Sequence, residues 1–574
     1  MLCGMGTLYY GDNLDILRRY LGDATVDLVY LDPPFNSAQD YNAFFHEKDG
    51  SAAASQIKAF EDTWHWDTEA MRVYQSVTEQ PGKVSDVMQA FYTFLGGNDM
   101  MAYLTMMAPR LVELRRVLKP TGSLYLHCDP TASHYLKLLL DAVFGGQNFR
   151  NEIIWKRSSS HGDIKQGMRR CGRIHDVLLF YTKGDSYPWN PVFTPYDKEY
   201  VESIYRFQDE KGRRYAEDNL TAARPGGEVS YEWRVKRRKN SDERWIADLE
   251  EEHLHPRKGW EYLGVRPYKG RYWAYSKQNM IKMWKAGQII HRRTGFPRFK
   301  RLLDEQPGVP LQDIWTDVNP LAGSEKERLG YPTQKPLALL ERIIAASSNA
   351  GDLVLDPFCG CGTTVDAAQR LGRKWIGIDI TQLAISLIKN RLYDTYSKRL
   401  KIETIGEPAS PADAAILASQ DKFQFQWWAL GLVSARPVEQ KKGADHGIDG
   451  KILFRDDPRS ARPEQIVIQV KGGKTGVKDV RDLRGVLDRE KAAMGVLISL
   501  HEPTGPMETE AASAGFYTHK VNGRQYPRLQ LRTVKELMEG RSIERPSTVA
   551  ALDDTFKKAP PADAQPTEQN ELEF

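Results

Sequence analysis

The chain has 574 residues, of which 41% are hydrophobic and 27% charged, and its formal net charge is +4. That length exceeds what one hydrophobic core organises, so we expect two or three domains. No run approaches the ~20 apolar residues that span a bilayer, and the N-terminus lacks the pattern of an export signal. The five cysteines form no C-x-x-C pairs. This disfavours a zinc site or a disulfide framework, and a cytoplasmic location is expected.

In chain order, short apolar runs first alternate with amphipathic helical stretches, which is typical of an α/β sheet domain. The expected strands there are residues 26–31, 122–127 and 176–181. The chain then becomes polar, aromatic and basic, before the α/β pattern resumes with strands at 353–355 and 375–379. We therefore divide this part of the chain into residues 1–183, 184–330 and 331–397.

A linker that contains Pro408, Ser410 and Pro411 is expected at residues 398–420. After it, residues 421–540 are predicted to form a second α/β domain, with a helix at 423–431 and strands at 451–454, 465–470 and 495–499. Residues 541–574 contain much Pro, Ala, Gln and Glu and are predicted to be a disordered tail.

The first motif that carries chemistry is Asp32-Pro33-Pro34-Phe35, directly after an apolar strand. Two prolines fix φ and lack amide hydrogens, so the loop is stiff and its carbonyls point outward. The Asp32 carboxylate and the Pro33 carbonyl can accept both hydrogens of one NH₂ group. Phe35 offers a flat face for a base taken out of its stack. An ordinary strand ending in a tight turn explains the motif equally well when it is taken alone.

A second apolar strand ends at Asp356 and leads through Gly360 and Gly362 into a helix. Such glycines let a ligand approach backbone amides at a helix start. Val365 replaces the third glycine of a dinucleotide fingerprint, which favours a nucleoside ligand without a pyrophosphate. The next strand ends at Asp379, and a carboxylate at such a position commonly binds ribose hydroxyls.

Four segments in this order resemble an amino-group DNA methyltransferase of the permuted (β) type, in which the catalytic motif precedes the cofactor loop. They are G-D-N at 11–13, D-P-P-F at 32–35, Y-P-T-Q-K-P-L at 331–337 and D-P-F-C-G-C-G-T-T at 356–364. The resemblance covers nearly all of residues 8–397.

The resemblance implies a Rossmann-like domain that binds S-adenosylmethionine, with an inserted target-recognition region at residues 184–330. It implies direct methyl transfer, without a cysteine nucleophile or a metal. The catalytic residues would be Asp32, Pro33, Pro34 and Phe35. Cofactor-binding residues implied by the resemblance are Asp12, Thr333, Lys335, Asp356, Phe358, Gly360, Gly362, Thr363 and Asp379.

The chain also resembles the modification subunits of type III restriction systems, which act on adenine N6, and D-P-P-F favours adenine over cytosine. Cytosine N4, RNA or a protein amide are the alternative acceptors. The expected partners are double-stranded DNA and either a second copy of the chain or another subunit of a restriction system. Six tryptophans lie among basic residues in the recognition region, and small aromatic cores account for most of them: Trp189, Trp233, Trp245, Trp260, Trp273 and Trp284.

In the C-terminal domain, Asp449 precedes one strand, and Gln469-x-Lys471 ends the next. Residues 423–534 resemble Mrr-like restriction endonucleases of the PD-(D/E)xK type. The resemblance implies that Asp449 and Gln469 bind Mg²⁺ and that Lys471 stabilises the attacking water or the phosphate. Many nucleases carry Glu at the place of Gln469, so a domain that only holds DNA is the alternative. A phosphate-binding P-loop is disfavoured, because Ile468 replaces its first glycine.

Overall fold

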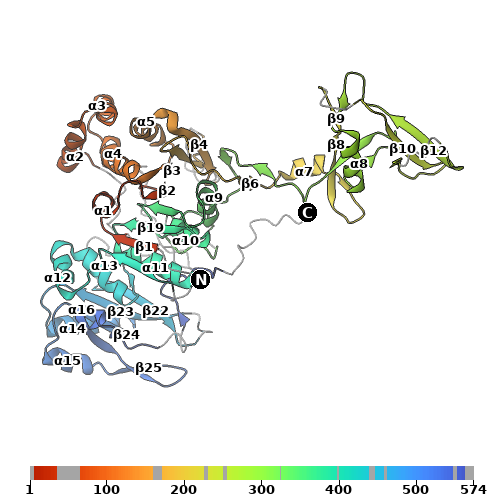
Figure 1. Cartoon of the computed structure of the whole chain (residues 1–574). Helices are drawn as coiled ribbons and strands as arrows, with labels where there is room; N and C mark the ends of the chain where they lie inside the picture. Colours follow the sequence, from red (N-terminus) through yellow and green to blue (C-terminus); the bar gives the residue numbers. More distant parts are fainter. Residues whose placement is uncertain are drawn as a thin grey trace. The chain divides into compact units, whose positions relative to one another are not determined.

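A computed structural model describes residues 6–34, 65–158, 171–224, 230–249, 255–322, 325–331, 333–396, 400–438, 447–457, 460, 462–546 and 552–562. The chain forms two compact units (Figure 1), of which one comprises Met1–Asn190 and Gln312–Phe574 and the other Pro191–Leu311. Across these described ranges, no helix combines the length and apolarity that a membrane crossing needs.

A nine-stranded sheet organises the N-terminal part of the first unit. Its strands are β1 (Gly6–Tyr10), β2 (Val26–Leu31), β3 (Leu118–Cys128), β4 (Phe149–Lys156), β5 (His175–Thr182), β17 (Ile314–Trp315), β18 (Leu353–Asp356), β19 (Lys374–Asp379) and β20 (Ile402–Ile405). Their order in the sheet is β17-β4-β5-β3-β2-β18-β19-β1-β20. All neighbours from β3 to β20 are parallel, and β5 runs antiparallel to both β3 and β4. The carboxyl ends of β2, β18 and β19 therefore meet at one edge.

Helices cover both faces of this sheet. One face carries α1 (Asn13–Tyr20), α2 (Thr68–Thr78), α3 (Lys83–Leu95), α4 (Asp99–Val117) and α5 (Ser133–Phe144), and the other carries α9 (Leu337–Ser347), α10 (Thr363–Arg370) and α11 (Gln382–Tyr396). A one-turn 3-10 helix, Gly146–Asn148, leads into β4. On the first face, Leu104 and Leu139 of the helices join Val29 and Leu355 of the strands in one buried cluster. Successive strand residues point to opposite faces, so the alternating positions pack against α9 to α11.

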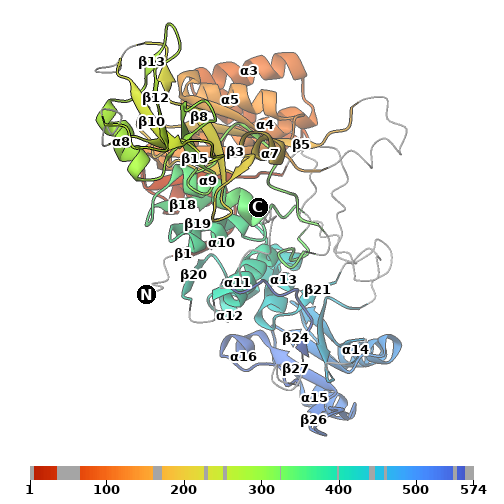
Figure 2. The ribbon, with the colours of Figure 1, turned by 90° about the vertical axis from the view of Figure 1, so that its right-hand side faces the viewer.

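The C-terminal domain belongs to the same unit and has a mixed sheet of its own (Figure 2). Its strands are β21 (Arg436–Pro437), β22 (Gly450–Arg455), β23 (Glu464–Lys471), β24 (Met494–Ser499), β27 (Leu529–Thr533) and β28 (Leu552–Asp553), beside the hairpin β25 (Phe516–Thr518) and β26 (Gln525–Pro527). Its helices are α12 (Pro411–Gln420), α13 (Lys422–Leu432), α14 (Val477–Glu490), α15 (Gly505–Ala512) and α16 (Val534–Met538). Two apolar clusters pack on the sheet, one around Phe425 and Ile468 and one around Val467 and Leu483.

The second unit consists of small antiparallel sheets. Its strands are β6 (Phe193–Thr194), β7 (Phe207–Gln208), β8 (Arg214–Asn219), β9 (Thr221–Ala222), β10 (Trp233–Arg238), β11 (Ile246–Ala247), β12 (Trp260–Val265), β13 (Tyr272–Trp273), β14 (Ile289–His291), β15 (Pro297–Leu302) and β16 (Val309–Pro310), with helices α7 (Lys198–Ile204) and α8 (Lys277–Lys285). Trp233, Trp245 and Trp273 are 2%, 7% and 0% exposed in one buried cluster. The interpretation of these tryptophans as core residues is confirmed.

The predicted α/β fold class is confirmed, and the predicted strands lie within β2, β3, β5, β18, β19, β22, β23 and β24. The unit Pro191–Leu311 is shorter than the predicted insertion at 184–330, because β17 already belongs to the nine-stranded sheet.

Two boundary predictions need correction. Residues 398–420 were expected to be a linker, but Ile402–Ile405 is β20, which pairs in parallel with β1, and Pro411–Gln420 is helix α12. Within the predicted tail, β28 pairs with β22, and the Ala562 amide donates to the Thr395 carbonyl at 3.0 Å. Both segments owe their order to partners that are distant in the chain, which local composition does not reveal.

Candidate functional site

The two predicted motifs lie at neighbouring strand ends. β2 and β18 are paired with Val29 beside Leu355, so Asp356 ends β18 near Tyr30, which precedes Asp32 by two residues. On the other side of β18, Asp356 lies beside Gly377 of β19, which ends at Asp379. Parallel strands thus bring three carboxylates to one edge of the sheet. Phe35 lies outside the described residues, whereas Pro33 and Pro34 directly follow Asp32.

Asp32 forms an ion pair with Lys335, whose Nζ lies 2.5 Å from Oδ2 of the carboxylate. The two side chains are 17% and 14% exposed, so water screens the pair only partly. Lys335 comes from the loop before α9, which the Pro336 N-cap joins to the helix. The structure therefore brings one predicted cofactor residue directly to the predicted catalytic carboxylate. Thr333, two residues earlier, is exposed.

Asp356 and Asp379 are 3% and 6% exposed. Burial raises the pKa of Asp356 to about 7, and the neighbouring carboxylates of Asp32 and Asp379 add to the rise. Burial likewise raises the pKa of Asp379 to about 6, against hydrogen bonds from Thr381 and Gly360. Carboxyl groups with raised pKa values that gather at one place are typical of functional sites.

The loop between β18 and α10 requires glycine at two positions. Gly360 has φ +50°, and a Cβ there would lie 3.1 Å from the Tyr331 ring. Gly362 has φ +77°, and a Cβ there would lie 2.8 Å from Ile388. The Gly360 amide donates to Oδ2 of Asp379 at 2.9 Å, which ties the loop to the end of β19.

Asp12 caps α1, accepting from the amides of Leu14 and Asp15. Arg110 of α4 donates to Asp12 at 2.5 Å and to Asn13 at 2.6 Å. The side-chain amide of Asn13 in turn donates to the Pro357 carbonyl at 2.8 Å. Pro357 belongs to the glycine loop between β18 and α10. The sequence motif G-D-N contained Asn13, but nothing in the sequence indicated Arg110, which lies inside a helix.

Two predicted cofactor residues have side chains that the structure directs elsewhere. The Thr363 hydroxyl accepts a hydrogen bond from Arg391 at 3.0 Å, and the residue is 6% exposed. Phe358 packs against the buried cluster on the α4 side of the sheet, and its amide donates to Asp356 at 3.0 Å. The buried Thr363 side chain is thus engaged within the protein, whereas the Phe358 ring is only partly buried.

The residues at this edge fit S-adenosylmethionine. The ligand carries hydroxyl and amino groups, and the carboxyl groups of Asp356 and Asp379 can accept hydrogen bonds from them. Oδ1 of Asp379 accepts from the Thr381 amide and hydroxyl, and Oδ2 accepts from Gly360. A carboxylate offers about four acceptor positions, so one remains for a ribose hydroxyl.

The predicted nuclease residues also come together, at the start of β22 and the end of β23. Asp449 accepts from the Val470 amide at 2.7 Å and from the Gln426 side chain at 3.1 Å. The Gln469 amide donates to the Gly447 carbonyl, while its Oε1 is buried without a hydrogen-bond partner. Lys471 lies 3.8 Å from Asp479.

These residues give Mg²⁺ little support. Among the described residues, the site offers one carboxylate, Asp449, which already accepts two hydrogen bonds, and the neutral amide of Gln469 in place of a second carboxylate. Throughout the described parts of the chain, no group of three or more His, Cys, Asp or Glu side chains is arranged to hold a metal ion.

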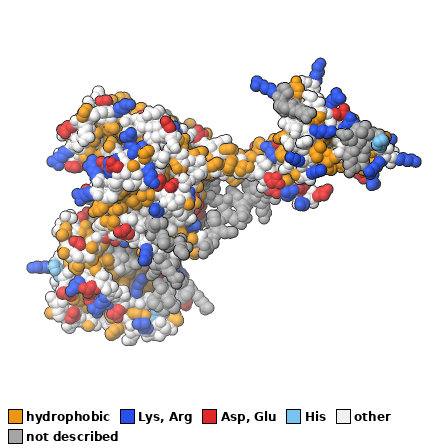
Figure 3. All heavy atoms as spheres, viewed as in Figure 1, with side chains coloured by type: hydrophobic (Ala, Val, Ile, Leu, Met, Phe, Trp, Pro, Cys, Tyr) orange, Lys and Arg blue, Asp and Glu red, His pale blue; other side chains and the backbone are white. Residues whose placement is uncertain are grey.

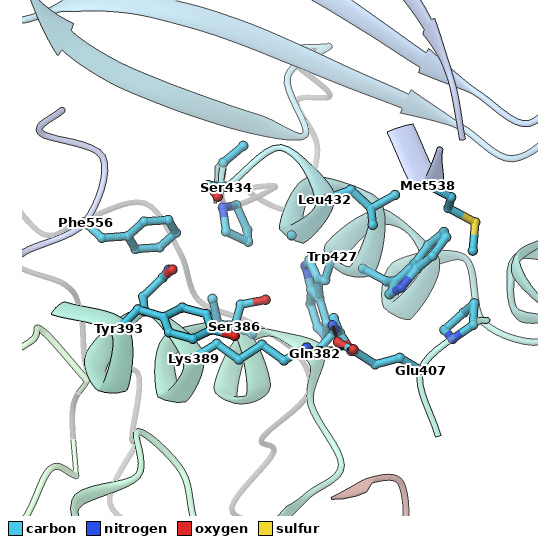
Figure 4. A pocket seen from close by; sticks show the side chains of 17 residues that line it. Gln382, Ser386, Lys389, Tyr393, Glu407, Trp427, Leu432, Ser434, Met538 and Phe556 are labelled. Atoms are coloured by element: carbon cyan, nitrogen blue, oxygen red, sulfur yellow. Dashed lines mark hydrogen bonds and ion pairs between the residues drawn. The ribbon is translucent and has the colours of Figure 1, made fainter. Parts of the chain in front are cut away.

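A cavity of about 640 Å³ lies between α11 and α13 (Figure 4). Trp427 and Tyr393 line it, and Glu407 binds Lys389 at 2.7 Å beside it. None of its lining residues belongs to either predicted site. The cavity lies within the first unit, and the sequence predicts no catalytic or binding role for the residues around it.

The sequence of the chain matches two known families. A family described as "DNA methylase" (N6_N4_Mtase) matches residues 26–390, which is more than half of the chain. A family described as "NACHT-associated inactive Restriction Endonuclease 1" matches residues 428–539.

Individual relatives agree with the first match. The type II methyltransferase M.EcaI of Enterobacter cloacae is 31% identical over 50% of this chain and 57% of its own length. The StyLTI Mod subunit, a type III restriction-modification enzyme of Salmonella typhimurium, is 24% identical over 69% of this chain and 54% of its own length. The chain thus matches just over half the length of these relatives.

Among solved structures, the M1.HpyAVI–SAM complex covers 68% of this chain and 99% of its own, with 16% identity and a TM-score of 0.29. The PvuII DNA methyltransferase (cytosine-N4-specific) covers 67% of this chain and 84% of its own, with 14% identity and a TM-score of 0.28. Similarities this low add nothing to the sequence match. With a parallel sheet that joins the D-P-P loop to a glycine loop, and a family match over residues 26–390, the chain belongs to the N6_N4_Mtase family of DNA methylases.

Proposed function

We propose that this chain transfers a methyl group from S-adenosylmethionine to the N6 amino group of adenine in duplex DNA, within a restriction-modification system. The observation that carries the proposal is the Asp32–Lys335 ion pair at a strand end next to the glycine loop. The D-P-P-F motif and the similarity of the chain to a type III Mod subunit support the adenine assignment.

The chain's own residues supply orientation. The Asp32 carboxylate and the Pro33 carbonyl accept the two amino hydrogens of the base, which leaves the nitrogen lone pair directed at its methyl donor. Asp379 would hold a ribose hydroxyl, and the backbone of the loop from Asp356 to Gly362 would hold the methionine part. S-adenosylmethionine would supply an electrophilic methyl group and leave as its thioether, while the Asp32 carboxylate would take up the proton that the methylated amino group loses, so no covalent enzyme intermediate is needed.

The second unit is proposed to read the DNA sequence. Lys and Arg side chains project from its surface (Figure 3), and among them Arg238, Lys239, Arg266 and Lys269 are exposed. Such side chains neutralise phosphates and contact base edges in the major groove.

Nucleoside analysis tests the base that is modified. Duplex DNA without modified bases is incubated with the chain and deuterium-methyl-labelled S-adenosylmethionine, digested and analysed by mass spectrometry. We expect labelled N6-methyladenine and no labelled N4-methylcytosine. Labelled N4-methylcytosine alone would assign the enzyme to the alternative acceptor, and label in neither nucleoside would reject the proposed function.

For the C-terminal domain we infer DNA binding without cleavage, rather than the Mg²⁺-dependent cleavage that its Mrr-like pattern predicts. The hydrogen-bonded Asp449 carboxylate and the neutral Gln469 support this inference, as does similarity to a family described as inactive. Near Lys471, the exposed Lys474 and Lys478 offer positive charge to a DNA backbone. The Mrr-like assignment itself stays a prediction.

Accordingly, supercoiled and linear DNA should remain intact when the chain is incubated with Mg²⁺, as followed by gel electrophoresis. The Lys471→Ala variant should methylate DNA at the wild-type rate, because Lys471 lies in the other domain. Cleavage by the wild-type chain that disappears in Lys471→Ala would restore the nuclease hypothesis.

A further inference from the structure

Beside the Asp32 loop, three buried polar side chains from β2, β3 and β5 form a continuous series of contacts. The Tyr30 hydroxyl lies 2.9 Å from Nδ1 of His127, and Nε2 of His127 lies 3.1 Å from Oδ2 of Asp176. The three residues are 2%, 0% and 2% exposed. One tautomer of His127 serves both contacts: Tyr30 donates to Nδ1, and the Nε2–H group donates to Asp176.

The register of the sheet places this series next to the predicted catalytic residue. The last paired residues of the parallel strands β2 and β3 are Leu31 and Leu126, and Asp32 and His127 directly follow them in the chain. Tyr30 precedes Asp32 by two residues and therefore points to the same face of the sheet. Because β5 runs antiparallel to β3, its first residues lie at this same edge, and Asp176 meets His127 there.

Asp176 also connects the series to Lys335. Burial on its own would raise the pKa of the Asp176 carboxyl. The hydrogen bond from His127, with the positive charges of Lys335 and Arg157, instead holds that pKa below its usual value. Arg157 lies 3.2 Å from the other oxygen of the carboxylate. The positive charge of Lys335, which pairs with Asp32, is therefore attracted by two carboxylates, those of Asp32 and Asp176.

Burying three polar groups in a sheet costs free energy that leucines in their place would not. We propose that His127 is a positioning residue for methyl transfer. It fixes Tyr30 beside the Asp32 loop and orients Asp176, whose negative charge keeps Lys335 in place against Asp32. This inference rests on the proposed methyltransferase function and adds to it residues that lie outside the four motifs.

The test compares two tyrosines that each lose only a hydroxyl. Tyr125 lies on β3 directly beside Tyr30 in the sheet register and is 1% exposed, but its hydroxyl makes a buried 2.7 Å hydrogen bond to Ser347 of α9 instead of joining the His127 series. Tyr30→Phe and Tyr125→Phe should therefore lower the melting temperature similarly. We expect Tyr30→Phe to slow single-turnover methyl transfer about tenfold, with an unchanged Kd for S-adenosylmethionine and an unchanged KM for DNA. Tyr125→Phe should keep the wild-type rate.

A second variant, Asp176→Asn, keeps the shape of the side chain and removes the charge near Lys335, so it should slow transfer at least as much as Tyr30→Phe. Equal rates for Tyr30→Phe and Tyr125→Phe would overturn the inference, as would a Tyr30→Phe chain that fails to fold while Tyr125→Phe folds. A wild-type chain that methylates no DNA would instead reject the proposed function, which is a distinct result.

Discussion

Replacing Asp32 by alanine should reduce methyl transfer to DNA by about a thousandfold or more, because the amino group of the base loses its charged acceptor. The Kd for S-adenosylmethionine should change little, since Asp379 and the glycine loop are left intact. Asp32→Asn should be less impaired than Asp32→Ala, because the amide oxygen can still accept an amino hydrogen although the negative charge is lost. Transfer of a radiolabelled methyl group to duplex DNA under single-turnover conditions measures the rate.

Asp27→Asn is the matched control on the same strand. Asp27 lies at the opposite end of β2, where it binds Lys119 at 2.7 Å and the Leu353 amide at 2.9 Å. Its loss should lower the melting temperature and leave the rate of methyl transfer unchanged. If Asp32→Ala kept a rate within tenfold of the wild type, the assignment of Asp32 as the acceptor would have to be abandoned.

The second large effect is expected for Gly362→Ala. At φ +77° an alanine is strained by about 1–2 kcal/mol, and its Cβ would in addition lie 2.8 Å from Ile388. The loop must shift to relieve that contact, and the amides that approach the ligand shift with it. We expect the Kd for S-adenosylmethionine, measured by isothermal titration calorimetry, to rise about tenfold or more.

Gly372→Ala is the control that distinguishes an effect of backbone strain from an effect on ligand binding. It has φ +70°, and a Cβ there would meet nothing within 4 Å. Gly372→Ala should therefore lower the free energy of unfolding by a similar strain, about 1–2 kcal/mol, and leave the Kd unchanged. A wild-type Kd in Gly362→Ala would show that the ligand does not depend on this loop.

The sequence was informative where function depends on local order along the chain. An apolar strand followed by Asp32, and another followed by Asp356, can be recognised without coordinates. Parallel pairing of such strands then makes their carboxyl ends neighbours. The Lys335–Asp32 pair was not derivable in the same way, because the motifs indicate which residues matter but not which of them touch.

What the sequence did not reveal depends on distant partners. Arg110 lies in the middle of α4 and reaches Asp12 only after the sheet has formed. His127 and Asp176 lie in largely apolar strands, whose composition predicts a structural role in the core and no role in a functional site. Thr363 was predicted to face the cofactor from its place in a motif, yet its hydroxyl turns inward to Arg391, a helix residue 28 positions later.

The strand β20 limits how the chain can be divided. It follows α11 and forms the last strand of the nine-stranded sheet, so a truncation at residue 397 would strip β1 of a neighbour and leave an unpaired sheet edge prone to aggregation. The segment at residues 552–562 leaves the C-terminal sheet at β28 and reaches back to α11 through Ala562 and Thr395. The C-terminal domain is thus connected to the nine-stranded sheet domain twice, by the chain that follows β20 and by residues 552–562. Proteolytic cleavage of one connection would leave the two domains joined through the other.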